Sequence, residues 1–230
     1  MKRLVKALKK IFYYDEPSGL APLTKEEYDR DLLDSDNERA KKAFEMAWTI
    51  RNFEIEMYWK RANYFWAFIA STFVGYFALV NSINYITPDR FDHVEVYFII
   101  CIGFTLSIAW ILTNKGSKSW QRNWEAHVDL LEDKFTGPLY KIVYPTKTYS
   151  VTKINEIVSF IFALVWLLLG IKYLFDKNLI NFTFGNINWL VVFSTIGVIL
   201  SVSAMVFGYG RGRFKALNVK MYRRNVIYQK

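Results

Sequence analysis

The chain has 230 residues, of which 53% are hydrophobic and 18% are aromatic, and its formal net charge is +9. This apolar fraction is high for a soluble domain, and the apolar residues are gathered into blocks, which indicates a membrane protein. Nearly all Lys and Arg residues lie between these blocks, so the basic charge is a signal of membrane topology and not of nucleic-acid binding.

The N-terminal region, residues 1–61, begins with a basic amphipathic stretch over residues 1–14. This stretch fits either a surface helix held by anionic lipid headgroups or a frayed terminus. Capping-box patterns begin at Thr24 and at Ser35. They predict a short helix that ends near Leu33, followed by a long helix that continues toward the first apolar block.

The long helix enters the membrane through a charged and aromatic segment, FEIEMYWKRANYFWAFIA, and five charged residues around this entry are called the collar. The collar consists of Arg51, Glu54, Glu56, Lys60 and Arg61. Helical spacing places Arg51, Glu54 and Arg61 on one face of the helix. Glu56 and Lys60 have the spacing of an i,i+4 ion pair. Charges at the membrane boundary are costly when unpaired. We therefore predict ion pairs between helices or between subunits; the alternative is a solvated helix end.

Four apolar blocks are long enough, or nearly so, to cross a bilayer, and they occupy residues 62–86, 96–113, 157–175 and 187–209. The predicted fold is all-α: a polytopic membrane protein with four transmembrane helices. The first pair of spans lies in 62–113 and the second pair in 154–208.

Lys and Arg residues alternate across these blocks. Thirteen lie in residues 1–61, seven in 114–153 and seven in 209–230, whereas each short link, 87–95 and 176–186, holds one. The positive-inside rule then places both termini and the long segments in the cytoplasm.

The cytoplasmic segment 114–153 carries an apolar stripe at helical spacing. The stripe is Trp120, Trp124, Val128, Leu131 and Phe135, and an opposing charged stripe is Lys118, Arg122, Glu125, Asp129 and Glu132. The pattern predicts that the second span extends about five turns into the cytoplasm and ends near Gly137 and Pro138. Thr152 is a candidate cap for the third span.

An apolar seam precedes the first span and also needs a packing partner. It consists of Ala40, Phe44, Ala47, Trp48 and Ile55. We predict that this seam packs against the apolar stripe, within or between subunits, so that two transmembrane helices extend into a helical cytoplasmic layer. The tail, 209–230, is basic throughout, and five of its residues are predicted to contact anionic lipid: Arg211, Arg213, Lys215, Arg223 and Arg224.

Little in the sequence points to catalysis. His93 and His127 lack the spacing of a metal site, Cys101 has no partner cysteine, and the glycines from Gly208 onward follow an apolar block instead of a strand. Small residues such as Gly103 recur at i,i+4 within the spans, a pattern that favours helix packing over a pore lining. No cofactor, metal site or enzymatic activity is expected.

Two stretches together resemble the RipA family of octameric bacterial inner-membrane proteins. They are FEIEMYWKRANYFWAFIA with Gly75-Tyr76-Phe77, and SKSWQRNWEAHVDLLED followed by GPLYK at 117–141. The resemblance implies a homo-oligomer, an octamer, in the bacterial inner membrane, with a role in adaptation to the environment and in some members to a host cell. It implies no known reaction and no catalytic residue.

The sequence and the resemblance together predict a non-enzymatic scaffold or sensor whose partners are its own copies, anionic membrane lipids and an unidentified cytoplasmic protein, with no nucleic acid. The alternative is a ring-shaped channel or transporter for ions or small solutes, because a ring of helices can enclose an axial path.

Overall fold

The structure is a computed structural model that describes residues 23–34, 36–86, 94–143, 149–176, 188–207 and 210. These residues form helices and connecting turns. The elements are α2 (Lys25–Leu32), α3 (Asn37–Ile86), α4 (Val94–Leu131), the short 3₁₀ helix η1 (Glu132–Lys134), α5 (Val151–Asp176) and α6 (Trp189–Val206).

The helices α2 and α3 both begin with side-chain caps. Thr24 and Glu27 form the predicted capping box at the start of α2, because each side chain accepts from the other residue's backbone N–H. At the start of α3 the cap is Asp36, whose side chain accepts from the backbone N–H of Glu38 at 3.2 Å. The predicted cap Ser35 lies outside the described residues.

The long helix α3 runs without interruption from the charged N-terminal region through the whole first apolar block. No proline occurs within it, so nothing removes a backbone hydrogen bond along its 50 residues. α4 likewise continues about five turns past its apolar block, as the stripe predicted.

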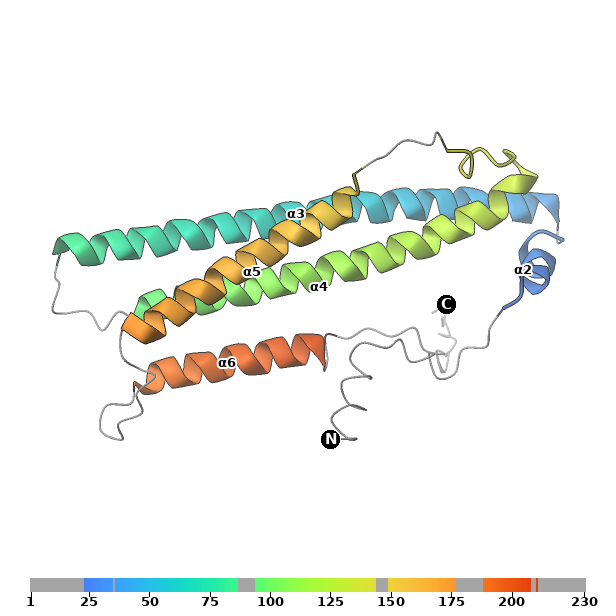
Figure 1. Ribbon diagram of the computed structural model, residues 1–230. Helices are drawn as coiled ribbons and strands as arrows, with labels where there is room; N and C mark the ends of the chain where they lie inside the picture. Colours follow the sequence, from blue (N-terminus) through green and yellow to red (C-terminus); the bar gives the residue numbers. More distant parts are fainter. Residues whose placement is uncertain are drawn as a thin grey trace, which may run out of the picture.

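α4 is the central helix of the fold. It packs against α3, α5 and α6, and Figure 1 shows α3 and α6 on opposite sides of it with α5 crossing the pair α3–α4 at an angle. α2 lies at the end of the α3–α4 pair that is far from α6. At this end α3 and α4 extend beyond α5 and α6 (Figure 1). The fold therefore has a four-helix part and a narrower extension formed by α3 and α4.

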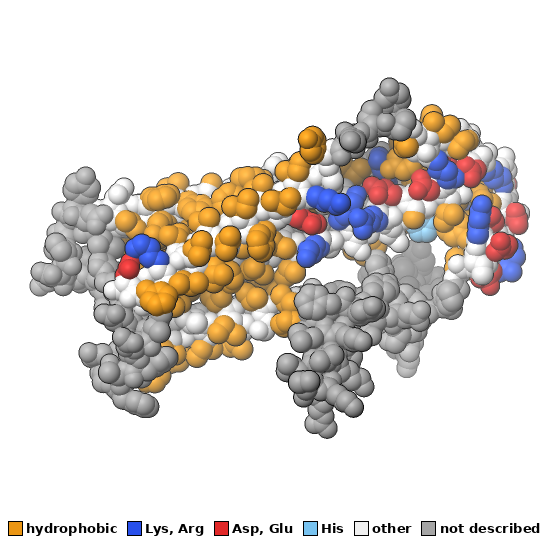
Figure 2. Space-filling view, viewed as in Figure 1, with side chains coloured by type: hydrophobic (Ala, Val, Ile, Leu, Met, Phe, Trp, Pro, Cys, Tyr) orange, Lys and Arg blue, Asp and Glu red, His pale blue; other side chains and the backbone are white. Residues whose placement is uncertain are grey.

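Four helices are long and apolar enough to cross a membrane: α3, α4, α5 and α6. In Figure 2 hydrophobic side chains cover the four-helix part, and Lys, Arg, Asp and Glu gather on the extension. The all-α fold with four candidate spans is therefore confirmed. We call the extension, with α2 and the turn after η1, the extramembrane layer.

Two indoles, those of Trp110 and Trp166, are fully buried in the membrane part. Trp166 of α5 is fully buried, stacks on Phe73 of α3 with ring centroids 4.3 Å apart, and packs against Ile100 of α4. A Cβ built on Gly103 would lie 2.3 Å from the Trp166 ring. The small residue at position 103 thus permits the close approach of α4 and α5, which is the packing role predicted for it.

Two predictions about helix ends need correction. α5 begins at Val151, before Thr152, and the oxygen of the Ser150 side chain accepts from the backbone N–H of Lys153 at 3.4 Å. Ser150 therefore occupies the capping position. α4 ends at Leu131 rather than at Gly137, which lies in the following turn with a φ of 66° that glycine adopts readily.

Candidate functional site: the extramembrane layer

The α3–α4 pair of the extramembrane layer packs through some residues of each sequence pattern, while Trp48 of the seam is 41% exposed. Ala40 and Ala47 of α3 are buried, as are Val128 and Leu131 of α4, and Phe44 stacks on Phe135 with centroids 5.8 Å apart. The two alanines allow the helices to approach closely, while the larger side chains of α4 fill the space between them.

Trp120, which was expected in this stripe, is not buried with the others. Its side chain is 46% exposed, and the buried face of α4 continues instead through Gln121 and Ser117. Trp124 is half-buried and lies against the imidazole of His127, with ring centroids 5.2 Å apart. The apolar stripe therefore holds only for the last turns of α4, and polar residues replace it toward the membrane.

A partly buried polar pair joins α2 to α4. The Tyr28 hydroxyl and His127 Nδ1 share a hydrogen bond of 2.8 Å, and Tyr28 also packs against Ala47. Burial lowers the pKa of His127, and burial, with a smaller contribution from Asp29, raises the pKa of Tyr28 to about 12. At neutral pH both groups are therefore uncharged, which suits their position between helices.

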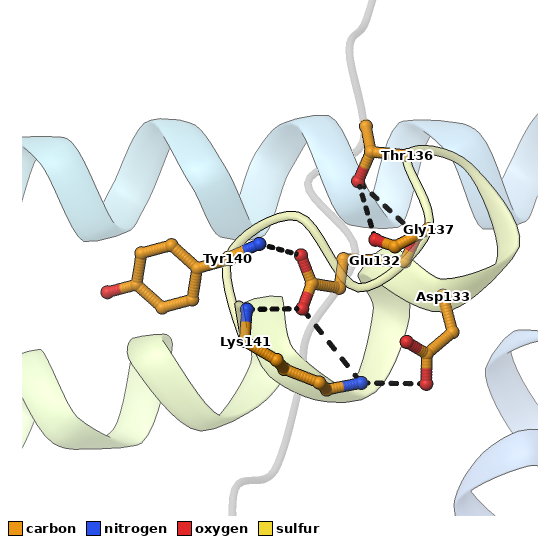
Figure 3. A network of polar contacts seen from close by, with 6 residues as sticks. All are labelled: Glu132, Asp133, Thr136, Gly137, Tyr140 and Lys141. Carbon is orange, nitrogen blue, oxygen red and sulfur yellow. Dashed lines mark hydrogen bonds and ion pairs between the residues drawn. The ribbon is translucent and has the colours of Figure 1, made fainter. Parts of the chain in front are cut away.

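Glu132 was expected on the charged face of α4, and the structure corrects this: the side chain is fully buried. One carboxylate oxygen accepts from the backbone N–H of Tyr140 at 2.6 Å and the other from that of Lys141 at 3.1 Å (Figure 3). The Lys141 ammonium lies 3.9 Å from the same carboxylate and 2.7 Å from Asp133. Glu132 thus folds the turn after η1 back onto the end of α4.

The folded turn leaves an apolar groove against α3. The groove has a volume of about 420 Å³. It is lined by Phe44, Glu45, Trp48, Thr49, Glu132, Thr136, Leu139 and Tyr140. Tyr140 meets Trp48 edge to face at 6.1 Å, so two aromatic rings, one from each wall, define the groove.

The collar residues occupy two different environments. Lys60 and Glu56 form an i,i+4 ion pair of 2.7 Å whose side chains are more than half exposed, which is the solvated arrangement held as the alternative. Arg61 faces α4: it lies 3.8 Å from Glu54 on its own helix and donates to the Ser117 hydroxyl at 2.5 Å.

Arg51, the remaining collar residue, is matched with aromatic groups in the described part of the chain. It donates to the Tyr140 hydroxyl at 3.1 Å, and its guanidinium lies 5.3 Å from the Trp48 ring centroid and 5.2 Å from that of Tyr140. Cation–π contacts of this geometry stabilise an arginine that has left water in part. Arg51 therefore joins α3 to the folded turn.

A buried polar cluster lies where the extramembrane layer meets the membrane part. The side-chain amide of Asn155 on α5 donates to the Tyr58 hydroxyl of α3 at 2.8 Å and lies 3.5 Å from the Asn114 oxygen of α4. Three helices are thus joined by hydrogen bonds at the level of the collar. Buried hydrogen bonds of this kind fix the register of helices because a shifted helix would leave the same groups unpaired.

Sequence patterns alone did not identify Asn114, Ser117, Gln121 or Asn155. The signal was present for three of them: positions 107, 110, 114, 117 and 121 continue the 3–4 spacing of the buried face of α4. A search for apolar residues at helical spacing misses these positions because their side chains are polar.

No group of three His, Cys, Asp or Glu side chains in the described ranges could hold a metal ion. His93 and the five basic tail residues predicted to contact lipid lie outside the described residues.

The fold and the site define a class of protein: an α-helical, multi-spanning membrane protein whose first two spans continue into a packed helical layer. The model of the octameric membrane protein family (8xMP) matches residues 41–175, which include the collar, the groove and the first three spans. The chain belongs to this family, in agreement with the octameric family that the sequence resembles. No curated protein and no solved structure matches the chain.

Proposed function

We propose that the protein is a homo-octamer of the bacterial inner membrane that acts as a non-enzymatic scaffold or sensor during adaptation to the environment or to a host cell, with both termini in the cytoplasm. The observation that carries the proposal is the extramembrane layer itself. Its apolar groove lies against α3, which runs unbroken into the membrane. A partner at the groove, a neighbouring subunit included, would therefore act on the same rigid helix that crosses the bilayer.

A second candidate is a channel or transporter, and one feature of the membrane part favours it. A groove of about 340 Å³ between α4 and α6 is lined in part by Thr105, Ser194 and Ser201. The hydroxyls of Thr105 and Ser194 donate to backbone carbonyls of their own helices, at 2.8 and 2.6 Å. Hydroxyls satisfied in this way suit helix packing, so the scaffold or sensor is preferred.

Ion flux separates the two proposals. Purified protein is reconstituted into liposomes loaded with a pH- or potassium-sensitive dye, and flux is compared with that of protein-free liposomes. The scaffold or sensor predicts equal flux in both. Flux that depends on protein concentration and is reduced by Ser194→Leu would instead establish a conducting path past α6.

A further inference from the structure

One flank of α3 in the extramembrane layer is apolar and partly exposed. Met46, Ile50, Phe53 and Met57 follow one another at spacings of four, three and four, so they form one stripe. Met46 is 59% exposed and Phe53 is 53% exposed, and the other two are half-buried. Such a seam is the pattern by which one helix packs along another surface.

The lipid bilayer does not reach most of this stripe. The charges of α3 stop at Arg61, and Met46 precedes Ala62 by sixteen residues, or about 24 Å of helix, while Phe53 precedes it by about 14 Å. The headgroup layer on one side of a bilayer is only about 5–8 Å thick. The exposed methionine and phenylalanine therefore face water unless another protein surface covers them.

The opposite side of α3 carries a complementary apolar surface. The groove lies on this side, because Phe44, Glu45, Trp48 and Thr49 form its α3 wall. At 100° per residue these positions are centred roughly 140° from the stripe around the helix. Leu139 at the groove is 71% exposed, and α5, which meets the same side of α3 through the contacts of Phe162 with Trp66 and Phe73, exposes Val151 and Ile154 at its start (54% and 48%).

A convex stripe and a concave groove on opposite sides of one helix suit a ring. Contacts between different surfaces of identical chains close into cyclic assemblies when the rotation allows it. We propose that the α3 stripe of one subunit docks on the groove and the α5 start of the next subunit, and that this contact closes the octamer in the extramembrane layer. The inference rests on the proposed octamer and adds the surfaces that build it.

Rotation about the membrane normal fixes the register of this contact, since copies in one bilayer lie at the same height. Met46 lies between the groove-lining residues Phe44 and Trp48, so it faces the neighbour's groove beside Leu139. Tyr58 is hydrogen-bonded to Asn155, which places Met57 level with Ile154 and Phe53, four residues earlier, within one residue of Val151.

Paired cysteines test the contact and its register. On a Cys101→Ser background, Met46→Cys is combined with Leu139→Cys, and Phe53→Cys with Val151→Cys; an off-register control combines Met46→Cys with Ile154→Cys. A short bis-maleimide is added to the detergent-solubilised or membrane-embedded protein, and products are separated by mass. Both in-register pairs should give a ladder of linked subunits, and the control and each single cysteine should give monomer.

The outcomes distinguish this inference from the proposed octamer. An octameric wild type in which neither in-register pair is linked, or in which Met46→Cys links to itself, would overturn the inference and leave the octamer standing. A wild type that is monomeric before any substitution would overturn the octamer and this inference with it.

Substitution of the stripe gives a second readout. Phe53→Lys should convert the octamer to smaller species in native mass measurements, while Trp120→Lys, at a similarly exposed aromatic on α4, should leave it intact. An octamer unchanged by Phe53→Lys combined with Met46→Lys would mean that another partner covers the stripe, contrary to the proposal.

Discussion

Replacement of Glu132 by glutamine should open the turn that forms the groove. The buried carboxylate of Glu132 is the acceptor for two backbone N–H groups, those of Tyr140 and Lys141. Glutamine keeps one acceptor oxygen but turns an NH₂ group toward the other N–H. One buried donor is then unsatisfied and the charge that strengthened the second bond is lost, a combined cost of about 2–4 kcal/mol.

The neighbouring carboxylate supplies the matched control. Asp133 also contacts Lys141, at 2.7 Å, but both side chains are substantially exposed, so Asp133→Asn should cost only about 0–1 kcal/mol. The assay is tryptic cleavage at Lys141 in detergent-solubilised protein. A local loss of 2–4 kcal/mol raises the open fraction roughly 30- to 700-fold, and cleavage should accelerate accordingly in Glu132→Gln. Equal cleavage rates for the two variants would refute the structural role assigned to Glu132.

Three further predictions concern the membrane part, α2 and the collar. Gly103→Ala should lower the unfolding free energy by about 1–3 kcal/mol because its Cβ meets a buried indole, whereas Gly197→Ala, with nothing within 4 Å, should not; equal thermal stability of the two would contradict this. Because burial lowers the pKa of His127, the unfolded state binds more protons at pH values between that lowered pKa and about 6.5, so protection of α2 from proteolysis should fall as the pH decreases through that interval. The fall should be smaller in His127→Gln, and an equal fall in both proteins would contradict the role of His127. Arg61→Met should destabilise the chain by about 1–3 kcal/mol, more than Lys60→Met, because it removes the donor to the Ser117 hydroxyl; identical melting curves would count against the collar assignment.

The sequence predicted the architecture well because each span is a long apolar block and each extramembrane helix has a distinct pattern. The capping box at Thr24 and the continuation of α4 past the membrane both depend on local spacing, which is visible in one chain. The packing of Val128 and Leu131 on Ala47 follows from the same periodicity.

What the sequence did not predict depends on tertiary contacts between distant segments. Glu132 has helical spacing appropriate to a charged face, and only the return of the chain after Gly137 turns it into a buried acceptor. Asn155 likewise belongs to no pattern that is visible in the sequence. It reaches the Tyr58 hydroxyl only because α5 crosses α3 in the fold. Apart from the Asn52 side chain, the groups that Arg51 contacts are aromatic, and a search for carboxylates does not consider them.

Native mass spectrometry of the intact complex in mild detergent tests the central claim most directly. The account predicts one dominant species at eight times the 27.2 kDa of a single chain, because the chain belongs to a family described as octameric and the proposed ring contact places the exposed α3 stripe against the next copy. A species at the mass of one chain, maintained at high protein concentration and across several detergents, would contradict it.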